Sequence, residues 1–502
     1  MPSIQTLPPE VLSEIFLNCV VTNAATLPSR APILLTRVTR SWRAVALSTP
    51  RLWSYLCLSR RSGCKGYYEA HTHLPSDDVT KARSYVTALR TWLSLSKCTS
   101  LTLRFFVPQI APTAGDEDVL AEYMQILCTH SARWKDVKIL IPYNFPQIIT
   151  VLNQCRSLPL LESFYFNNKK AISEPIDITI LESAPLLRRA RITYPYLESW
   201  FLPWSQLTCL SIEHCTDMED LNAMDELSFF DVDLFIVILS HCINLEVLNV
   251  HCDFVVFPAV TRSTSTFAIL PQLQSFTMVI STDSEDEEDA NEAETNSRTT
   301  CSMPDPLGLA KIADIGFLTH FSESLEYLEI SICSLPLHMA TSMLECLPNL
   351  TSMVIRLNDT LPHDREGILG GLTLTSTAYR SKQLVPMLVQ LEVSWWDHSF
   401  AYCEEGLEAM SHFYEILTTM IESHWQAWSC HVLEVGGGTD APSGLTTLCL
   451  RWHMKEIASS QCARIARCME EGLHLVKWLK KPPSFRSDAD DMHVMSEMIM
   501  VE

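Results

Sequence analysis

The sequence predicts an α/β fold in which an N-terminal module of three short helices precedes an irregular solenoid with a parallel sheet. Two observations predict this fold. Residues 7–56 carry short apolar stripes at helical spacing, and after residue 90 the chain repeats one apolar phrase eleven times. The chain has 502 residues, of which 47% are hydrophobic and 19% charged, a composition typical of globular rather than disordered chains.

The first helix of the module is expected within residues 7–16, LPPEVLSEIF. Pro8 and Pro9 suit the first turn of a helix, because the N–H groups of that turn have no intrahelical partner. The apolar residues that follow repeat at i and i+4 and form one broad stripe. They are Val11, Leu12, Ile15 and Phe16.

A second helix is expected to end at Pro50, and a third short apolar set follows it. The second helix has apolar residues spaced three, four and three apart: Leu35, Val38, Trp42 and Val45. The third set consists of Leu52, Trp53 and Leu56. A domain of about 50 residues is marginally stable by surface-to-volume scaling. An apolar face that this domain cannot bury in its own core is therefore expected to bind a partner.

These residues resemble an F-box. The F-box pattern begins with Leu-Pro and ends with Trp-Arg followed by Leu-Trp, which here are Leu7-Pro8, Trp42-Arg43 and Leu52-Trp53. The amino-acid sequence from Ala31 to Leu56 is similar to that of the F-box-like domains that are abundant in mushroom-forming (basidiomycete) fungi. The segment from His130 to Ile139, HSARWKDVKI, resembles one often found downstream in those proteins.

The resemblance implies a role in ubiquitin transfer. F-box domains bind a Skp-type adaptor and, through it, a cullin, so the chain would be the substrate-recognition subunit of an SCF-type (Skp-cullin-F-box) E3 ubiquitin ligase. It would have no catalytic activity, and its solenoid would hold an unknown protein substrate. The residues expected to form or support the adaptor face are Leu7, Pro8, Leu12, Ile15, Phe16, Val38, Trp42 and Trp53.

Two alternatives to this reading remain open. In the first, residues 7–56 are only a helical cap on the rest of the fold. In the second, the repeats form a protein-interaction scaffold that never assembles into a ligase. Sequence alone does not separate them.

The phrase repeated after residue 90 is an apolar residue, two others, an apolar residue, one other and an apolar residue. Its final pair alternates with period two, as in a short strand. Five copies have a proline two residues before the first position, which stops an incoming helix and leaves the chain extended: Pro159, Pro185, Pro271, Pro348 and Pro386. Each unit thus follows the order helix, break, strand, which is a degenerate leucine-rich-repeat pattern.

The eleven phrases are Cys98-Leu101-Leu103, Trp134-Val137-Ile139, Leu161-Phe164-Phe166, Leu187-Ala190-Ile192, Leu207-Leu210-Ile212, Leu245-Leu248-Val250, Leu273-Phe276-Met278, Leu325-Leu328-Ile330, Leu350-Met353-Ile355, Leu388-Leu391-Val393 and Leu445-Leu448-Leu450. The middle residue of each final pair is expected to point outward onto an open face that binds protein. These outward residues are Thr102, Lys138, Tyr165, Arg191, Ser211, Asn249, Thr277, Glu329, Val354, Glu392 and Cys449. These residues are chemically mixed, so they do not indicate which class of ligand the face binds.

The predicted boundaries are an F-box-like domain at 1–60, a linker or helical connection at 61–89, the solenoid at 90–480 and a tail at 481–502. The solenoid is expected to contain a disordered acidic loop at 281–297, because Ser281 to Asn296 holds eight acidic residues and no basic one. Ser284 in this loop suits an acidophilic kinase; the alternative is an unmodified solubilising loop. Further helices are expected at Glu404 to Trp428 and at Ile457 to Leu479.

Composition and motifs exclude several functions. With 59 acidic and 37 basic residues the formal charge is −22, which disfavours binding to nucleic acid or to an anionic membrane. Arg188, Arg189 and Arg191 lie close together, as either a local basic patch or a solvated strand edge. Catalytic and zinc motifs are not found, so no enzyme activity, metal or cofactor is expected.

The expected compartment is cytoplasmic and/or nuclear. The N-terminus shows no secretory signal, and no apolar run approaches the roughly 20 residues of a membrane-spanning helix. The 18 cysteines include no C-x-x-C pair, so they are expected to be reduced and mostly buried.

Overall fold

The structure is a computed structural model that describes residues 7–20, 30–59, 79–106, 114–141, 146–155, 157–168, 177–194, 197–214, 232–252, 270–280, 324–331, 344, 347–358, 388–396, 415–423, 447–451, 459–470 and 473–478. The chain divides into two compact units. The first comprises Met1–Ile330 and Ser342–Asn349, and the second comprises Ser331–Thr341 and Leu350–Glu502. Both units combine parallel strands with helices, so the predicted α/β fold class is confirmed.

The N-terminal module begins with helix α1 (Pro9–Asn18), in which Pro9 lies in the first turn as predicted, whereas Pro8 is the N-cap residue just before it. The expected second helix is in fact two helices, α2 (Leu35–Val38) and α3 (Arg40–Ser48). Thr39 separates them with an extended backbone, and its hydroxyl accepts a hydrogen bond of 3.1 Å from the Trp42 N–H. A threonine hydroxyl competes in this way with helix continuation, which apolar spacing does not reveal.

A short 3-10 helix, η3 (Pro50–Trp53), closes the module, and strand β1 (Tyr55–Ser59) follows directly. β1 pairs in parallel with β2, so the sheet begins inside the predicted 1–60 domain, and α4 (Val79–Leu95) crosses the predicted boundary at residue 90. The spacing of Leu52, Trp53 and Leu56 suits a helix, and it concealed the change to a strand.

The described residues of the first unit form nine strands, and the successive pairs from β1 to β8 are parallel and in sequence order. The other strands are β2 (Leu101–Phe106), β3 (Trp134–Ile141), β4 (Ser163–Asn168), β5 (Arg189–Tyr194), β6 (Cys209–His214), β7 (Val247–Cys252), β8 (Ser275–Ile280) and β9 (Tyr327–Ser331). β9 continues the series, because the N–H groups of Glu326 and Tyr327 both bond to the Gln274 carbonyl.

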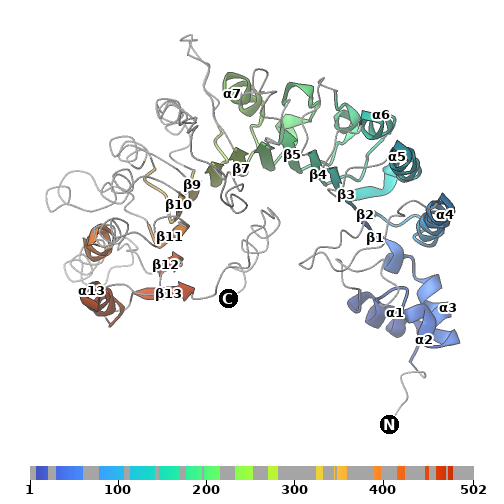
Figure 1. The fold of residues 1–502 in the computed structure, drawn as a ribbon, viewed down its shortest axis with the longest axis horizontal. Coiled ribbons are helices and arrows are strands. Elements are labelled where there is room, and N and C mark those ends of the chain that lie inside the picture. The colour runs from blue at the N-terminus through green and yellow to red at the C-terminus, as the bar shows by residue number, and fades with distance from the viewer. Residues whose placement is uncertain are drawn as a thin grey trace, which may run out of the picture. The chain divides into compact units, whose positions relative to one another are not determined.

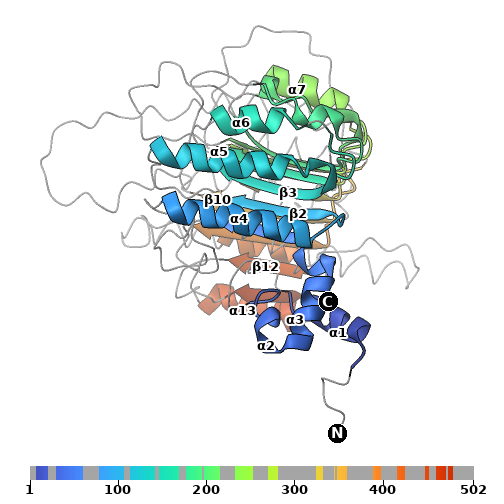
Figure 2. The ribbon, with the colours of Figure 1, turned by 90° about the vertical axis from the view of Figure 1, so that its right-hand side faces the viewer.

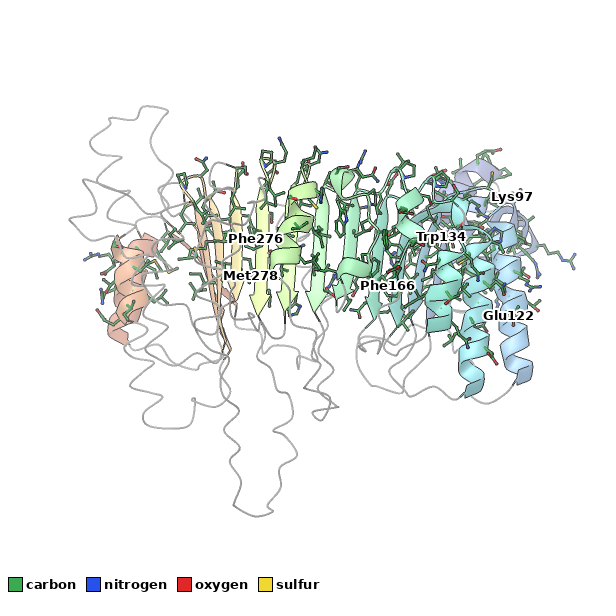
Figure 3. All side chains as sticks on the ribbon, turned by 90° about the horizontal axis from the view of Figure 1, so that it is seen from above. Lys97, Glu122, Trp134, Phe166, Phe276 and Met278 are labelled. Atoms are coloured by element: carbon green, nitrogen blue, oxygen red, sulfur yellow. The ribbon has the colours of Figure 1, made fainter. Side chains whose placement is uncertain are left out.

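Helices α4, α5 (Ala114–Cys128), α6 (Pro146–Asn153) and α7 (Val232–His241) all lie on one side of this sheet (Figure 1), and α4, α5 and α6 run side by side in Figure 2. Short 3-10 helices occupy other connections: η4 (Ser131–Arg133), η5 (Ile180–Ser183), η6 (Leu197–Ser199) and η7 (Trp204–Gln206). Figure 3 shows Lys97, just after α4, at the edge of the sheet where the strands begin.

The side chains that point from the strands toward these helices form the core of the first unit. One buried row crosses seven neighbouring strands in register: Leu103, Val137, Phe164, Ala190, Leu210, Leu248 and Phe276. These are the middle apolar residues of seven predicted phrases, except that β2 contributes Leu103, the last residue of its phrase. The period-two pattern therefore identified the core side of each strand.

Tight turns lead into several strands. The Leu161 N–H donates to the Leu158 carbonyl at 3.2 Å, and the same bond recurs between Leu187 and Ala184 and between Leu273 and Leu270. In these three turns a proline, Pro159, Pro185 or Pro271, takes the second position, where its fixed φ is favourable. The recurring proline thus has a local structural reason.

The second unit contains β10 (Ser352–Asn358), β11 (Gln390–Trp396), β12 (Thr447–Arg451) and β13 (His474–Trp478), paired in parallel and in sequence order. Part of the helix expected at Glu404 to Trp428 is present at residues 415–423. The prediction of one helix from Ile457 to Leu479 is wrong at its C-terminal end. α13 (Ser459–Glu470) ends early, and His474–Trp478 form β13 beside β12.

All eleven phrases lead into strands in the structure, and β1 and β13 are two strands that the phrases missed. Ser284, the acidic loop at 281–297 and the tail at 481–502 lie outside the described residues.

Candidate protein-interaction surfaces

Three of the residues predicted for the adaptor face are buried inside the N-terminal module. Leu12 and Phe16 form the buried side of α1, and Trp53 is buried in η3. The Phe16 ring lies 5.0 Å from the Trp42 ring, and the Trp53 indole N–H donates to the Ala46 carbonyl at 2.9 Å. These side chains hold the helices together, so their part in any docking is to support the surface.

Four large apolar side chains among the described residues of the module are exposed. Ile15 on α1 and Val38 on α2 were predicted, with exposed fractions of 37% and 50%. Val11 and Leu34, each 44% exposed, were not predicted. Their burial depends on how α1 and α2 pack, so the stripe alone could not separate them from the buried Leu12 and Leu35. We call these four side chains the apolar docking set.

The remaining predicted residues lie between these extremes. Pro8 is exposed at the start of α1, whereas Leu7 and Trp42 are half-buried. The indole N–H of Trp42 is buried without a hydrogen-bond partner.

The module is joined to the sheet within the first unit. The Trp53 ring meets the Trp92 ring of α4 edge-on, with centroids 4.8 Å apart. Next to it, the Thr102 N–H of β2 donates to the Ser54 carbonyl at 2.9 Å. The module therefore covers the start of the sheet and also presents the apolar docking set.

A second surface is formed by the strand side chains that point away from the helices. The register between β2 and β3 shifts between Leu101 and Thr102, so Thr102 stands beside Asp136 and Arg104 stands beside Lys138. Thr102 points away from the buried Leu101 and Leu103, as predicted, and Arg104, two residues further on, is the outward residue of β2 that stands beside Lys138. A bulge of this kind is invisible in the apolar pattern.

Three cations and one aromatic ring stand side by side on β2 to β5. We call them the central row: Arg104, Lys138, Tyr165 and Arg191. Lys138 Nζ lies 4.5 Å from the centre of the Tyr165 ring, and the Arg191 guanidinium lies 4.7 Å from the same ring. Arg104 binds both carboxylate oxygens of Asp136, at 2.9 and 2.8 Å. The Tyr165 ring is thus flanked by two positive charges.

Glu213 on β6 fixes one end of the row. Its buried carboxylate is paired with the Arg191 guanidinium and accepts a hydrogen bond of 3.2 Å from the Asn167 side-chain N–H. Asn167 also donates to the Tyr165 hydroxyl at 3.1 Å. Ion pairing and these hydrogen bonds hold the central side chains in defined orientations.

The three neighbouring arginines of the sequence separate in the structure. Arg188 donates to the Gln206 carbonyl at 3.0 Å, whereas Arg189 and Arg191 point outward on β5. Burial raises the pKa of the neighbouring Cys209 thiol, and the positive charges of Arg189 and Arg191 oppose that rise. Arg189 and Arg191 therefore share the strand face with Cys209.

Within the described residues, no three or more His, Cys, Asp or Glu side chains gather as a metal-binding group would require. The described helices also include none long and apolar enough to cross a membrane.

The fold class defined by these strands and helices is an α/β solenoid with a parallel sheet. No protein-family model and no curated protein matches the chain. Among solved structures, one similar chain comes from the "Crystal structure of TLR13-ssRNA13 complex", with 12% identity and a TM-score of 0.25. The match covers 65% of this chain and 30% of that chain.

Proposed function

We propose that the chain is the substrate-recognition subunit of an SCF-type E3 ubiquitin ligase. In this proposal the N-terminal module docks on a Skp-type adaptor, and the outward strand face holds the protein to be modified. The chain itself is a receptor, and the chemistry of ubiquitin transfer belongs to the other subunits.

The apolar docking set carries the proposal. Among the described residues, four of the ten large hydrophobic side chains that are exposed lie between Val11 and Val38. Such a concentration in a small helical module is typical of a protein-binding surface. It coincides with the residues that resemble an F-box, which supports a Skp-type adaptor as the partner.

The coarser proposal is a protein-interaction scaffold without a ligase. The same polar strand face supports it, because open faces of repeat proteins commonly bind other proteins. The two proposals differ only in whether the module recruits an adaptor and a cullin.

The test is binding of the purified full-length chain to a Skp-type adaptor. We expect an Ile15→Asp, Val38→Asp double variant to bind at least about tenfold more weakly, because two carboxylates would be placed in an apolar interface. The matched control is Val237→Asp, Ile243→Asp, since these side chains are 49% and 53% exposed outside the module. Unchanged binding by the Ile15, Val38 variant would reject the docking surface.

Binding of a cullin distinguishes the ligase proposal from the scaffold proposal. A complex of chain, adaptor and cullin recovered in one pull-down supports the ligase proposal. Recovery of the strand-face partner with neither adaptor nor cullin would leave only the scaffold.

A further inference from the structure

We propose that the outward strand face between β2 and β6 binds an extended acidic segment of a partner protein. The contact surface consists of Arg104, Lys138, Arg189 and Arg191 together with the Tyr165 ring, and we call it the basic face. This inference rests on the target-binding half of the proposed function and names the chemistry of the target.

The charge of this face is opposite to that of the chain. On β2 to β6 the outward side chains include the four cations of the basic face and two carboxylates, Asp136 and Glu213. Four minus two leaves a local charge of +2, whereas the whole chain carries −22. An acidic ligand is attracted to this face and repelled by most of the remaining surface, which gives orientation as well as affinity.

The spacing of the side chains suits an extended peptide. Arg104, Lys138, Tyr165 and Arg191 occupy four successive strands in register. Neighbouring strands lie about 4.8 Å apart, so the row spans roughly 14 Å, the length of four or five extended residues at about 3.3 Å each. A short peptide lying across the strands would therefore meet each of these side chains in turn.

The two arginines in the row are already oriented before any ligand arrives. The Arg104 guanidinium donates two hydrogen bonds to the Asp136 carboxylate, and Arg191 forms an ion pair with Glu213. Of the five N–H donors of Arg104, these bonds and one to the Leu103 carbonyl use three, and the other two have no partner among the described residues. Preorganised donors of this kind lose little conformational entropy when they bind a carboxylate.

A nucleic-acid backbone fits this face less well. Phosphate-binding surfaces neutralise many regularly spaced charges, and their affinity depends on that number. Here the local excess is two charges on a chain of −22, so a duplex or a long single strand would meet repulsion beyond the face.

The test uses the full-length chain and a fluorescently labelled polyglutamate peptide, with polyglutamine as the uncharged comparison. The test variant is Lys138→Glu, Arg189→Glu, with Lys138→Gln, Arg189→Gln as a milder second variant. Arg104 and Arg191 are left in place. Removing Arg191 would leave the buried Glu213 carboxylate without its ion-pair partner and would destabilise the fold.

The matched control is Arg90→Glu, Lys97→Glu. Arg90 lies on α4 on the helix side of the sheet, and Lys97 lies at the edge where the strands begin (Figure 3). Both side chains are exposed, and the change in charge equals that of the test variant.

We expect the parent chain and the control to bind polyglutamate, and the Lys138, Arg189 glutamate variant to bind it at least about tenfold more weakly. Binding should weaken as salt is raised, and polyglutamine should not bind. Failure of the parent to bind polyglutamate, an equal loss in the control, or binding of a single-stranded oligonucleotide in place of the peptide would overturn the proposal.

Adaptor binding by the same variants separates this inference from the proposed function. The Lys138, Arg189 variants should bind a Skp-type adaptor like the parent, because their changes lie on the strand face. Adaptor binding without peptide binding refutes only the basic face. Peptide binding without adaptor binding supports the basic face and rejects the docking of the module.

Discussion

At the scale of single residues, burial controls the chemistry of the cysteines. The eight cysteines whose side chains the structure describes form no disulfide. Burial raises the pKa of Cys57 on β1 to about 11 and that of Cys242 after α7 to about 12. Cys19 and Cys98 are exposed instead. Because the thiolate is the reactive form, the two groups should differ strongly in reactivity.

We predict that iodoacetamide at pH 8 modifies Cys19 and Cys98 in the native chain, whereas Cys57 and Cys242 react only after unfolding. Peptide mapping by mass spectrometry measures each site separately. Denatured protein serves as the control in which all four sites react. Modification of Cys242 at the same rate as Cys98 in native protein would contradict the packing around α7.

At the scale of helices and strands, the apolar phrases were reliable because each records a strand with one buried side. β1 and β13 were missed for different reasons. Leu52, Trp53 and Leu56 have helical spacing, and the residues of β13 continue directly from an amphipathic helical pattern in α13. Period alone does not separate a short strand from the end of a neighbouring helix.

The interaction surfaces were only partly predictable for a related reason. The stripe on α1 contained both buried and exposed members, and only packing against α3 and η3 distinguishes Leu12 from Val11. The basic face depends on a register shift beside Leu101, which places Arg104 next to Lys138. Neither packing nor register is encoded in the spacing of apolar residues along one strand or helix.

The break between α2 and α3 gives a prediction at this scale. Thr39→Ala removes the 3.1 Å hydrogen bond that the Trp42 N–H donates to the threonine hydroxyl, and should destabilise α3 by about 1 kcal/mol. Thr39→Ser keeps an oxygen at the same place and should behave like the parent. Hydrogen exchange in the first turn of α3 measures the difference. Equal exchange in the alanine and serine variants would show that the cap contributes nothing.

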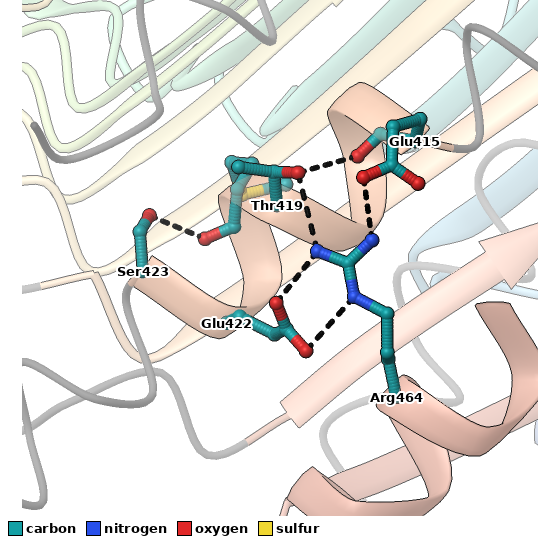
Figure 4. A network of polar contacts seen from close by, with 6 residues as sticks. Glu415, Thr419, Glu422, Ser423 and Arg464 are labelled. Carbon is teal, nitrogen blue, oxygen red and sulfur yellow. Dashed lines mark hydrogen bonds and ion pairs between the residues drawn. The ribbon is translucent and has the colours of Figure 1, made fainter. Parts of the chain in front are cut away.

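A partly exposed ion-pair network in the second unit gives a prediction about pH. Arg464 of α13 binds both carboxylate oxygens of Glu422, at 3.0 and 2.7 Å, and reaches Glu415 at 2.6 Å (Figure 4). The hydrogen bonds from Arg464 lower the pKa of Glu422 below its usual value of 4.5. A carboxyl group whose pKa is lowered by folding stabilises the fold above its usual pKa. That contribution disappears as the pH falls through the lowered pKa.

We therefore expect Arg464→Gln to reduce stability by about 1 kcal/mol at pH 7 and by less as the pH falls below 4.5. The measurement is the midpoint of thermal unfolding of parent and variant across this pH range. Arg51→Gln is the control, because the Arg51–Glu14 pair is 67% exposed on both sides and should contribute little. A difference between parent and Arg464→Gln that does not change with pH would contradict the role of Glu422.

At the scale of the whole molecule, the first unit carries both candidate interaction surfaces in one packed body. The Trp53–Trp92 contact and the pairing of β1 with β2 attach the N-terminal module to the sheet that carries the basic face. In the proposed receptor, a docked adaptor and a held target would both be anchored to the same unit. The second unit has its own strands and its own buried side chains.

The division into two units predicts where the effect of a core substitution ends. In a solenoid each repeat contacts mainly its neighbours, so stability is lost locally. Phe164→Ala in β4 and Leu391→Ala in β11 remove fully buried side chains and should each cost about 3 kcal/mol or more. We expect Phe164→Ala to speed hydrogen exchange in β3 to β5 and to leave β10 to β12 like the parent, and Leu391→Ala to do the reverse. Each variant is thus the control for the other, and faster exchange in both units from either substitution would mean that the chain unfolds as one cooperative body.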